Sequence, residues 1–101
     1  MELTQLRYFY CVYRGRSIRS ASSELNVTQQ AISRQIKNLE EELGVELFER
    51  KNSGVEPTEY GHMMADRVGK ILTELDSFVY SVQKRDQIIS GVVRLGVQCW
   101  Q

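Results

Sequence analysis

The chain has 101 residues, of which 42% are hydrophobic, so it can build one small core but not two. Thirteen Lys and Arg residues balance thirteen Asp and Glu residues, and this zero net charge by itself predicts binding to neither nucleic acid nor membranes. Because we find no basic-then-apolar leader and no apolar stretch near the ~18 residues of a membrane span, we expect a cytoplasmic protein.

Apolar side chains recur every three or four residues from Leu3 to Tyr13, which predicts a first helix that Gly15 ends. Ser17 is a suitable N-cap for a short second helix that ends near Asn26. The buried side of this second helix would hold three residues: Ile18, Ala21 and Leu25.

Thr28 predicts the start of a third helix, because its hydroxyl can accept a hydrogen bond from the free backbone amide of Gln30 or Ala31. Gly44 predicts the end of that helix. Only two residues separate the second and third helices, so together they have the outline of a helix-turn-helix unit.

The third helix has two different sides and two different halves. At ~100° per residue, the apolar side comprises Ile32, Ile36, Leu39 and Leu43. The opposite side comprises Gln30, Ser33, Arg34 and Lys37, all in the first two and a half turns. Between residues 14 and 37 five basic residues face one acid, whereas residues 40–49 contain five glutamates and end before the next base. A helix that enters a DNA groove by its N-terminal half would keep such acid away from phosphate.

After Gly44, the sequence predicts two short strands, Glu46 to Arg50 and Val55 to Pro57, joined by a turn at residues 52–54. Two residues of this hairpin would face the core: Leu47 and Val55. Arg50 and Lys51 would project near the tip, where they could hold a phosphate backbone or enter a narrow minor groove. This hairpin is the wing of a winged helix. A solvated hairpin whose charges serve solubility is the alternative.

From Thr58 to about Asp86 the pattern is that of one long helix without proline. Its apolar residues follow a spacing of four and three, which is a heptad seam: Met64, Val68, Ile71, Leu75, Phe78 and Val82. A helix of ~43 Å is too long for a fifty-residue head to cover, so we expect the seam to pair with a second copy. Packing of this stripe against its own domain is the alternative.

The last residues change to a β-branched run after Gly91, which predicts one strand with no sheet of its own. We therefore expect the chain to be a fragment that stops where another domain starts, with Cys99 and Trp100 left over. Cys11 lies far from Cys99 and forms no CxxC or Cys/His cluster, so neither zinc nor a disulfide is expected.

Catalytic signals are weak. His62 is the single histidine, with Asp66 one turn away, and the sequence has neither a GxSxG motif nor a glycine-rich phosphate loop. Such a pair at helical spacing is ordinarily a surface pair. We therefore expect no enzyme, no cofactor and no metal site.

Several motifs occur in one register along the chain. They are Leu6 and Phe9 in the first helix, Ser17, Ala21 and Leu25 in the second, TQQAISRQIKNLE and LGVELFER beyond them, PTEYG at residues 57–61, and GVVRLG at residues 91–96. In this combination residues 1 to 96 resemble the N-terminal region of LysR-type transcriptional regulators. Four positions depart from the family pattern: Arg16 for a common glycine, Ser22 for alanine, Gln30 for proline, and Pro57 for an aliphatic residue.

The resemblance implies a mainly α fold with three parts. Residues 1–58 would form a winged helix-turn-helix domain of three helices and a two-stranded wing, residues 59–89 a dimerising linker helix, and residues 90–101 the start of a missing effector-binding domain. It also implies binding to AT-rich interrupted palindromes beside promoters, as a homodimer, with a tetramer left open for the full-length protein. A small-molecule inducer would act only through the missing domain. Matched to the family, Gln29, Ser33, Arg34 and Arg50 are DNA contacts.

Side-chain chemistry divides the roles independently of the family. Gln29 and Gln30 can each give two hydrogen bonds to adenine, and Arg34 can do so to guanine. Six residues can donate to phosphates: Arg19, Thr28, Ser33, Lys37, Arg50 and Lys51. Arg14 and Arg16 could join these contacts or satisfy carbonyls at a helix end. The rival hypothesis is a coiled-coil interaction module that does not bind DNA, which would not need a third helix with an acid-free side.

Overall fold

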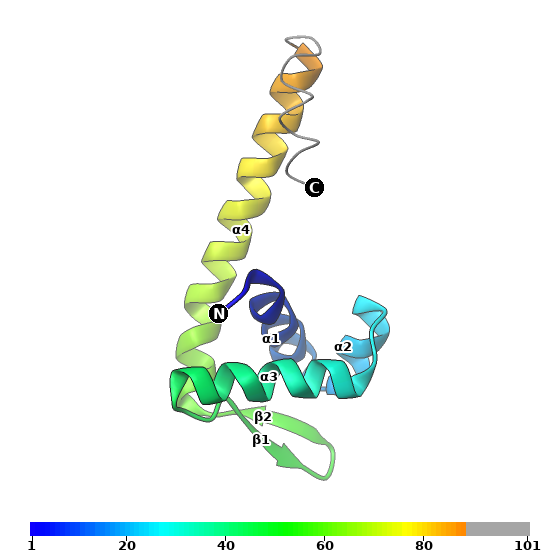
Figure 1. The fold of residues 1–101 in the computed structure, drawn as a ribbon, viewed down its shortest axis with the longest axis vertical. Coiled ribbons are helices and arrows are strands. Elements are labelled where there is room, and N and C mark those ends of the chain that lie inside the picture. The colour runs from blue at the N-terminus through cyan, green and yellow to red at the C-terminus, as the bar shows by residue number, and fades with distance from the viewer. Residues whose placement is uncertain (89–101) are drawn as a thin grey trace. The chain divides into compact units, whose positions relative to one another are not determined.

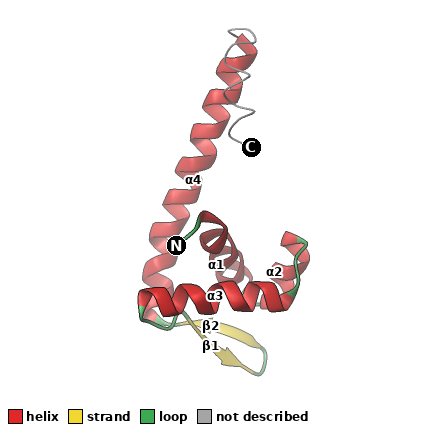
Figure 2. Cartoon of the chain, viewed as in Figure 1, coloured by secondary structure: helices red, strands yellow, loops and turns green. Residues whose placement is uncertain are grey.

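The structure is a computed structural model that describes residues 1–88. Its elements in chain order are α1 (Leu3–Gly15), α2 (Ile18–Leu25), α3 (Gln29–Leu43), β1 (Phe48–Lys51), β2 (Gly54–Pro57) and α4 (Glu59–Ile88) (Figures 1 and 2). The expected strand after Gly91, the expected domain at 90–101, Cys99 and Trp100 lie outside the described residues. Within residues 1–88, no helix has both the length and the hydropathy that crossing a membrane requires.

The helix boundaries follow local capping chemistry. The Ser17 hydroxyl accepts from the Ser20 amide at 3.0 Å, and the Thr28 hydroxyl accepts from the Ala31 amide at 3.0 Å. Gly44 ends α3 in the left-handed region at φ 75°. The three predicted caps are therefore confirmed.

The end of α1 differs from the expectation by one residue. Gly15 is the last helical residue, and Arg16 is the C-cap with a left-handed φ of 54°. The strained position is therefore occupied by an arginine, although glycine would adopt it without steric cost. Asn26, which ends α2 at φ 61°, is a residue type that tolerates this region better.

The core lies where α1, α2, α3 and the wing meet. Its fully buried large side chains are Phe9, Val12, Ile32, Leu39 and Leu47. Leu43, expected on the apolar side of α3, is instead 38% exposed. Helical periodicity predicts the direction of a side chain but not how far the neighbouring elements extend, and Leu43 lies in the last turn. Burial raises the pKa of the Cys11 thiol in this core, and the charge of Glu24 raises it further.

The wing is an antiparallel hairpin that pairs Phe48 with Pro57 and Lys51 with Gly54. Its first strand begins two residues later than predicted. The Glu40 carboxylate of α3 accepts the backbone amides of Leu47 at 2.6 Å and Phe48 at 3.3 Å, so the chain approaching the strand is bound to the helix instead. Leu47 and Val55 are 1% and 7% exposed, which confirms that both face the core.

α4 starts against the base of the wing. The Thr58 hydroxyl accepts from the Gly61 amide at 3.1 Å and donates to the Glu46 carbonyl at 2.5 Å. A Cβ at Gly61 would collide with the Leu47 carbonyl oxygen, so only glycine permits this approach. One compact unit spans Met1–Gly69, so the first turns of α4 belong to it.

The expected seam of α4 is only partly uncovered. Val68 is 3% exposed, and Ala65 nearby is 4% exposed, so Val68 is already covered by its own chain. For this residue the alternative of packing within the chain applies, because α4 begins inside the compact unit. Ile71 and Phe78 are 50% and 48% exposed. The other three seam residues are partly exposed: Met64, Leu75 and Val82.

Candidate nucleic-acid interface

The polar side of α3 is open to solvent in the structure. Its opposite side buries Ile32, Ile36 and Leu39, which holds the helix against the core. Five of the candidate DNA contacts are exposed: Thr28, Gln29, Gln30, Arg34 and Lys37. Ser33, between them, is half-buried. A helix held in this way presents donors and acceptors to a partner without first moving.

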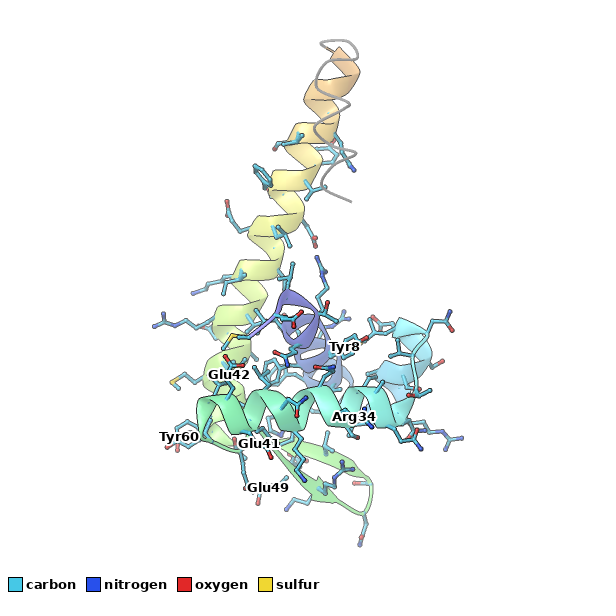
Figure 3. All side chains as sticks on the ribbon, viewed as in Figure 1. Tyr8, Arg34, Glu41, Glu42, Glu49 and Tyr60 are labelled. Atoms are coloured by element: carbon cyan, nitrogen blue, oxygen red, sulfur yellow. The ribbon has the colours of Figure 1, made fainter. Side chains whose placement is uncertain are left out.

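The charges of α3 are separated along its axis as the sequence indicated. Arg34 lies in the half of α3 that follows α2, whereas Glu41 and Glu42 lie in the other half (Figure 3). Glu40 is not simply surface acid, because it binds the two amides at the start of the wing. The exposed acid of α3 therefore lies at the end of the helix away from the α2–α3 turn, where it would not repel phosphate bound near Arg34.

A groove of about 750 Å³ runs between α3 and the wing. Figure 1 shows the hairpin directly beside α3, and residues of both elements line the groove. Its basic and hydroxyl lining comprises Ser33, Arg34, Lys37 and Arg50, and its acidic lining comprises Glu40, Glu46 and Glu49. The Arg50 guanidinium donates to the Ser33 hydroxyl at 3.4 Å, so the wing and α3 already share one polar contact. This basic part of the groove has the charge and donors that a phosphate backbone requires.

The other basic candidates lie at separate places. Arg19 is exposed in the first turn of α2, and Lys51 is exposed at the end of β1. Arg14 and Arg16 contact side chains of their own chain. Arg14 forms an ion pair with Glu24 at 2.8 Å, and the Arg16 guanidinium lies 4.7 Å from the centre of the Tyr13 ring.

His62 contacts a residue of another helix. Its Nδ1 is 3.0 Å from the Tyr13 hydroxyl, and the two rings meet edge to face at 5.6 Å. Tyr13 comes from α1, so the contact joins α1 to the first turns of α4. This role of His62 is structural, and spacing along one helix could not have revealed it.

Three contacts that shape the site were missed in the sequence. They are the Glu40 contact with the wing, the close approach at Gly61, and a hydrogen bond from the Val55 amide to the Arg16 carbonyl. The sequence did draw attention to the residues of the last two contacts, since Gly61 belongs to the PTEYG motif and Arg16 stands where the family commonly has glycine. Glu40 had none, because one glutamate among three gives no sign of its partner.

Comparison with known proteins decides the family. Residues 3–62 match the family described as "Bacterial regulatory helix-turn-helix protein, lysR family". The chain belongs to this LysR family. The match covers α1, α2, α3, the wing and the first turn of α4, so the fold is the winged helix-turn-helix of that family, continued by a long helix.

Relatives and solved structures agree with this assignment. The transcriptional regulator BenM of Acinetobacter baylyi is 41% identical over 96 residues, which are 95% of this chain and 31% of BenM. The regulator BudR of Klebsiella aerogenes is 38% identical over 97 residues, which are 96% of this chain and 68% of BudR. The chain therefore spans about a third of BenM and two thirds of BudR.

The similar solved structures include complexes with DNA. The complex of BenM_DBD with catB site 1 DNA has a TM-score of 0.80 at 44% identity, covering 90% of this chain and 99% of that one. The CbnR_DBD–DNA complex has a TM-score of 0.75 at 36% identity, covering 86% of this chain and 99% of that one.

Proposed function

We propose that this LysR-family chain binds double-stranded DNA in a sequence-specific manner, as a homodimer, and that it serves as the DNA-binding part of a bacterial transcriptional regulator in the cytoplasm. The observation that carries the proposal is the uncovered polar side of α3, opposite the buried Ile32, Ile36 and Leu39. An interaction module would not need this side free of acid. The structural likeness to DNA complexes of BenM and CbnR supports the same function.

Base recognition is assigned to three exposed residues at the start of α3. Gln29 and Gln30 each carry an amide that can bond adenine N6 and N7, and the Arg34 guanidinium can bond guanine O6 and N7. Each good pair of this kind discriminates by about 1–3 kcal/mol. Gln30 adds an amide where many family members have proline, so the preferred bases should differ from theirs at that position.

Phosphate binding is assigned to residues that surround the groove and the helix starts. They are Arg19, Thr28, Ser33, Lys37, Arg50 and Lys51. These contacts carry affinity rather than base preference and make binding depend on salt. About six phosphate contacts per pair of half-sites would give a log–log salt slope near −5, at ~0.9 per contact.

Dimerisation is assigned to the exposed part of the α4 seam. Ile71, Leu75, Phe78 and Val82 form this part, with Met64 before them, and Val68 is withdrawn because its own chain covers it. A two-fold dimer would place two α3 helices on two half-sites of an AT-rich interrupted palindrome beside a promoter. A tetramer and a small-molecule inducer would involve a further domain, which these residues do not include.

The decisive experiment first selects a binding site from randomised duplexes and then compares Arg34→Ala with Arg67→Ala. Arg67 is also exposed, but lies on α4 and serves as the matched control for loss of one positive charge. Arg34→Ala should weaken binding by roughly 5- to 150-fold for each half-site of the selected duplex, which corresponds to the 1–3 kcal/mol of one base pair contact, and should relax the base preference at one position of each half-site. Unchanged affinity of Arg34→Ala at moderate salt would favour the interaction module instead.

A further inference from the structure

The turn between α1 and α2 touches the wing through its backbone. The Val55 amide donates to the Arg16 carbonyl at 3.2 Å. Opposite residues in an antiparallel hairpin alternate between exchanging two hydrogen bonds and exchanging none. Because Val55 uses its N–H outside the hairpin, its partner Arg50 belongs to a pair of the second kind. The free edge of β2 is therefore bound to the turn.

Gly54 makes this approach sterically possible. Its φ is 142°, a region that side chains rarely adopt, and a Cβ there would lie 2.6 Å from the Arg16 carbonyl oxygen. Real Cβ atoms do not come so close to a backbone oxygen, so any side chain would push the wing away from the turn. We call the interactions of Arg16 with Gly54 and Val55 the turn–wing contact.

The turn is itself held firmly enough to act as a support. Arg16 keeps its left-handed φ of 54° while its guanidinium lies 4.7 Å from the Tyr13 ring centre. The Tyr13 ring in turn lies 6.2 Å from Phe9 and 6.3 Å from Tyr10, and its hydroxyl binds His62. The Arg16 carbonyl is thus carried by a cluster of rings from α1 and α4, and Phe9 within it is fully buried.

The register then connects this support to the proposed DNA contact. Val55 lies opposite Arg50, whose guanidinium crosses the groove to Ser33 at 3.4 Å. We propose that the turn–wing contact positions Arg50 over the phosphate-binding groove, so that Arg16 and Gly54 are positioning residues for DNA binding although neither side chain needs to touch the duplex. This inference depends on the proposed function, because it assigns the wing arginine its place relative to DNA.

A double-mutant cycle tests the proposal on the selected duplex. Gly54→Ala should weaken binding roughly 30-fold at ~0.15 M salt and lower the salt slope by about 1.8, because one phosphate contact, worth ~0.9, is lost in each of the two heads. In a chain that already carries Arg50→Ala, adding Gly54→Ala should cost almost nothing more. Equal losses in both backgrounds would overturn the proposal, since Gly54 would then act by another route.

The control for backbone strain is Gly44→Ala. Gly44 also has a positive φ, of 75°, but a Cβ there meets nothing within 4 Å. This variant should lose stability while its salt slope stays that of the unchanged chain. If Gly44→Ala lowers the slope as much as Gly54→Ala does, general destabilisation explains both results and the proposal is wrong.

A second pair of variants covers the case in which Gly54→Ala fails to fold. Arg16→Gly and Arg16→Val both remove the guanidinium, but only glycine adopts the left-handed conformation freely, whereas a β-branched residue opposes it. Arg16→Val should therefore bind the duplex several-fold more weakly than Arg16→Gly, with faster hydrogen exchange at the Val55 amide. Equal affinities together with unequal exchange would show that the contact exists but does not position Arg50.

The hydrogen-exchange measurement tests the turn–wing contact separately from the proposed DNA binding. It needs no DNA, so a protected Val55 amide in the unchanged chain tests the contact even if the proposed function fails. If the unchanged chain selects no duplex, the proposed function fails first. If it selects one and the cycle shows no coupling, only the positioning role fails.

Discussion

At the residue scale, different glycines of this chain meet different structural requirements. Gly44 supplies a left-handed helix end, which sequence pattern alone predicts. Gly61 instead lies in the first turn of α4, where glycine is a weaker helix former than alanine. The structure supplies the compensation, because α4 packs directly on the Leu47 carbonyl and leaves no room for a side chain.

The two helical glycines Gly61 and Gly15 therefore provide a matched comparison. Gly61→Ala should lower the free energy of unfolding by about 1–3 kcal/mol or more, because overpacking at the wing base outweighs the better helix propensity. Gly15→Ala should leave stability within about 0.5 kcal/mol of the unchanged chain, since the nearest atom to its Cβ is at an ordinary 3.5 Å. Urea denaturation measures both, and a stabilised Gly61→Ala would contradict the close approach.

At the scale of elements, α3 does more than carry the proposed DNA contacts. Its first half carries the exposed amides and bases, whereas Glu40 in its second half organises the next element. That carboxylate binds the amides of Leu47 and Phe48, which no strand partner satisfies. α3 and the wing are thus joined by a charged acceptor as well as by apolar packing.

Removal of this carboxylate tests its role. Glu40→Ala should lower the free energy of unfolding by about 1–3 kcal/mol, because two partly buried amides lose their acceptor. Glu40→Gln keeps one acceptor oxygen and should lose less. Glu41→Ala, next to it and exposed, should stay within about 0.5 kcal/mol of the unchanged chain. Hydrogen exchange at Leu47 and Phe48 should accelerate in Glu40→Ala, and unchanged exchange there would argue against the contact.

α4 combines two kinds of surface in one helix. Near its start Ala65 and Val68 are buried by their own chain, and farther along Ile71 and Phe78 are about half exposed. A single heptad pattern runs through both parts, so the spacing alone predicted that both would pair with a second copy. Burial distinguishes Val68 from Ile71 and Phe78, and the residues that stay uncovered are those proposed to contact a second copy.

A substitution in the later part tests dimerisation. Phe78→Asp should raise the dissociation constant of the dimer by roughly a hundredfold or more, since each copy loses about 1.5 kcal/mol or more of apolar burial. Thr73→Asp introduces the same charge on the opposite side of α4 and should leave the dimer intact. Sedimentation equilibrium measures both. A monomer in the unchanged chain at micromolar concentration would contradict the seam itself.

At the scale of the whole molecule, the compact unit Met1–Gly69 contains the complete winged helix-turn-helix and the first turns of α4. The zero net charge of the chain does not show that basic residues gather between residues 14 and 37 and glutamates between residues 40 and 49. A single head of this kind offers few phosphate contacts, so useful affinity should need two heads acting together.

Truncation after Gly69 separates the head from the dimer. A chain of residues 1–69 should unfold cooperatively by circular dichroism, remain monomeric, and bind a two-half-site duplex with roughly half the salt slope of the whole chain, because half the phosphate contacts are lost. An equal slope would show that one head makes all of the contacts. A truncated chain that fails to fold would show that the unit depends on residues after Gly69.

The sequence by itself determined the order of the elements, the capped ends of the helices, the two sides of α3 and the family. Each of these depends on residues close together in the chain: Ser17 and Thr28 cap their own helices, and Ile32 and Ile36 lie one turn apart. Local spacing carries such information because helix geometry is regular. The exposed candidates Gln30, Arg34 and Lys37 followed from the same periodicity, whereas Gln29 followed from the family resemblance.

Only the tertiary structure decided how the wing is held and which seam residues stay uncovered. The contacts of Glu40 with Leu47, of Arg16 with Val55 and of Tyr13 with His62 join residues 7, 39 and 49 positions apart, respectively. No periodic pattern encodes such pairs, because they depend on where separate elements meet when the core closes. For the same reason Leu43 is exposed, although helical spacing placed it on the apolar side of α3. Val68 is covered by its own chain, although the heptad spacing placed it in the seam expected to pair with a second copy.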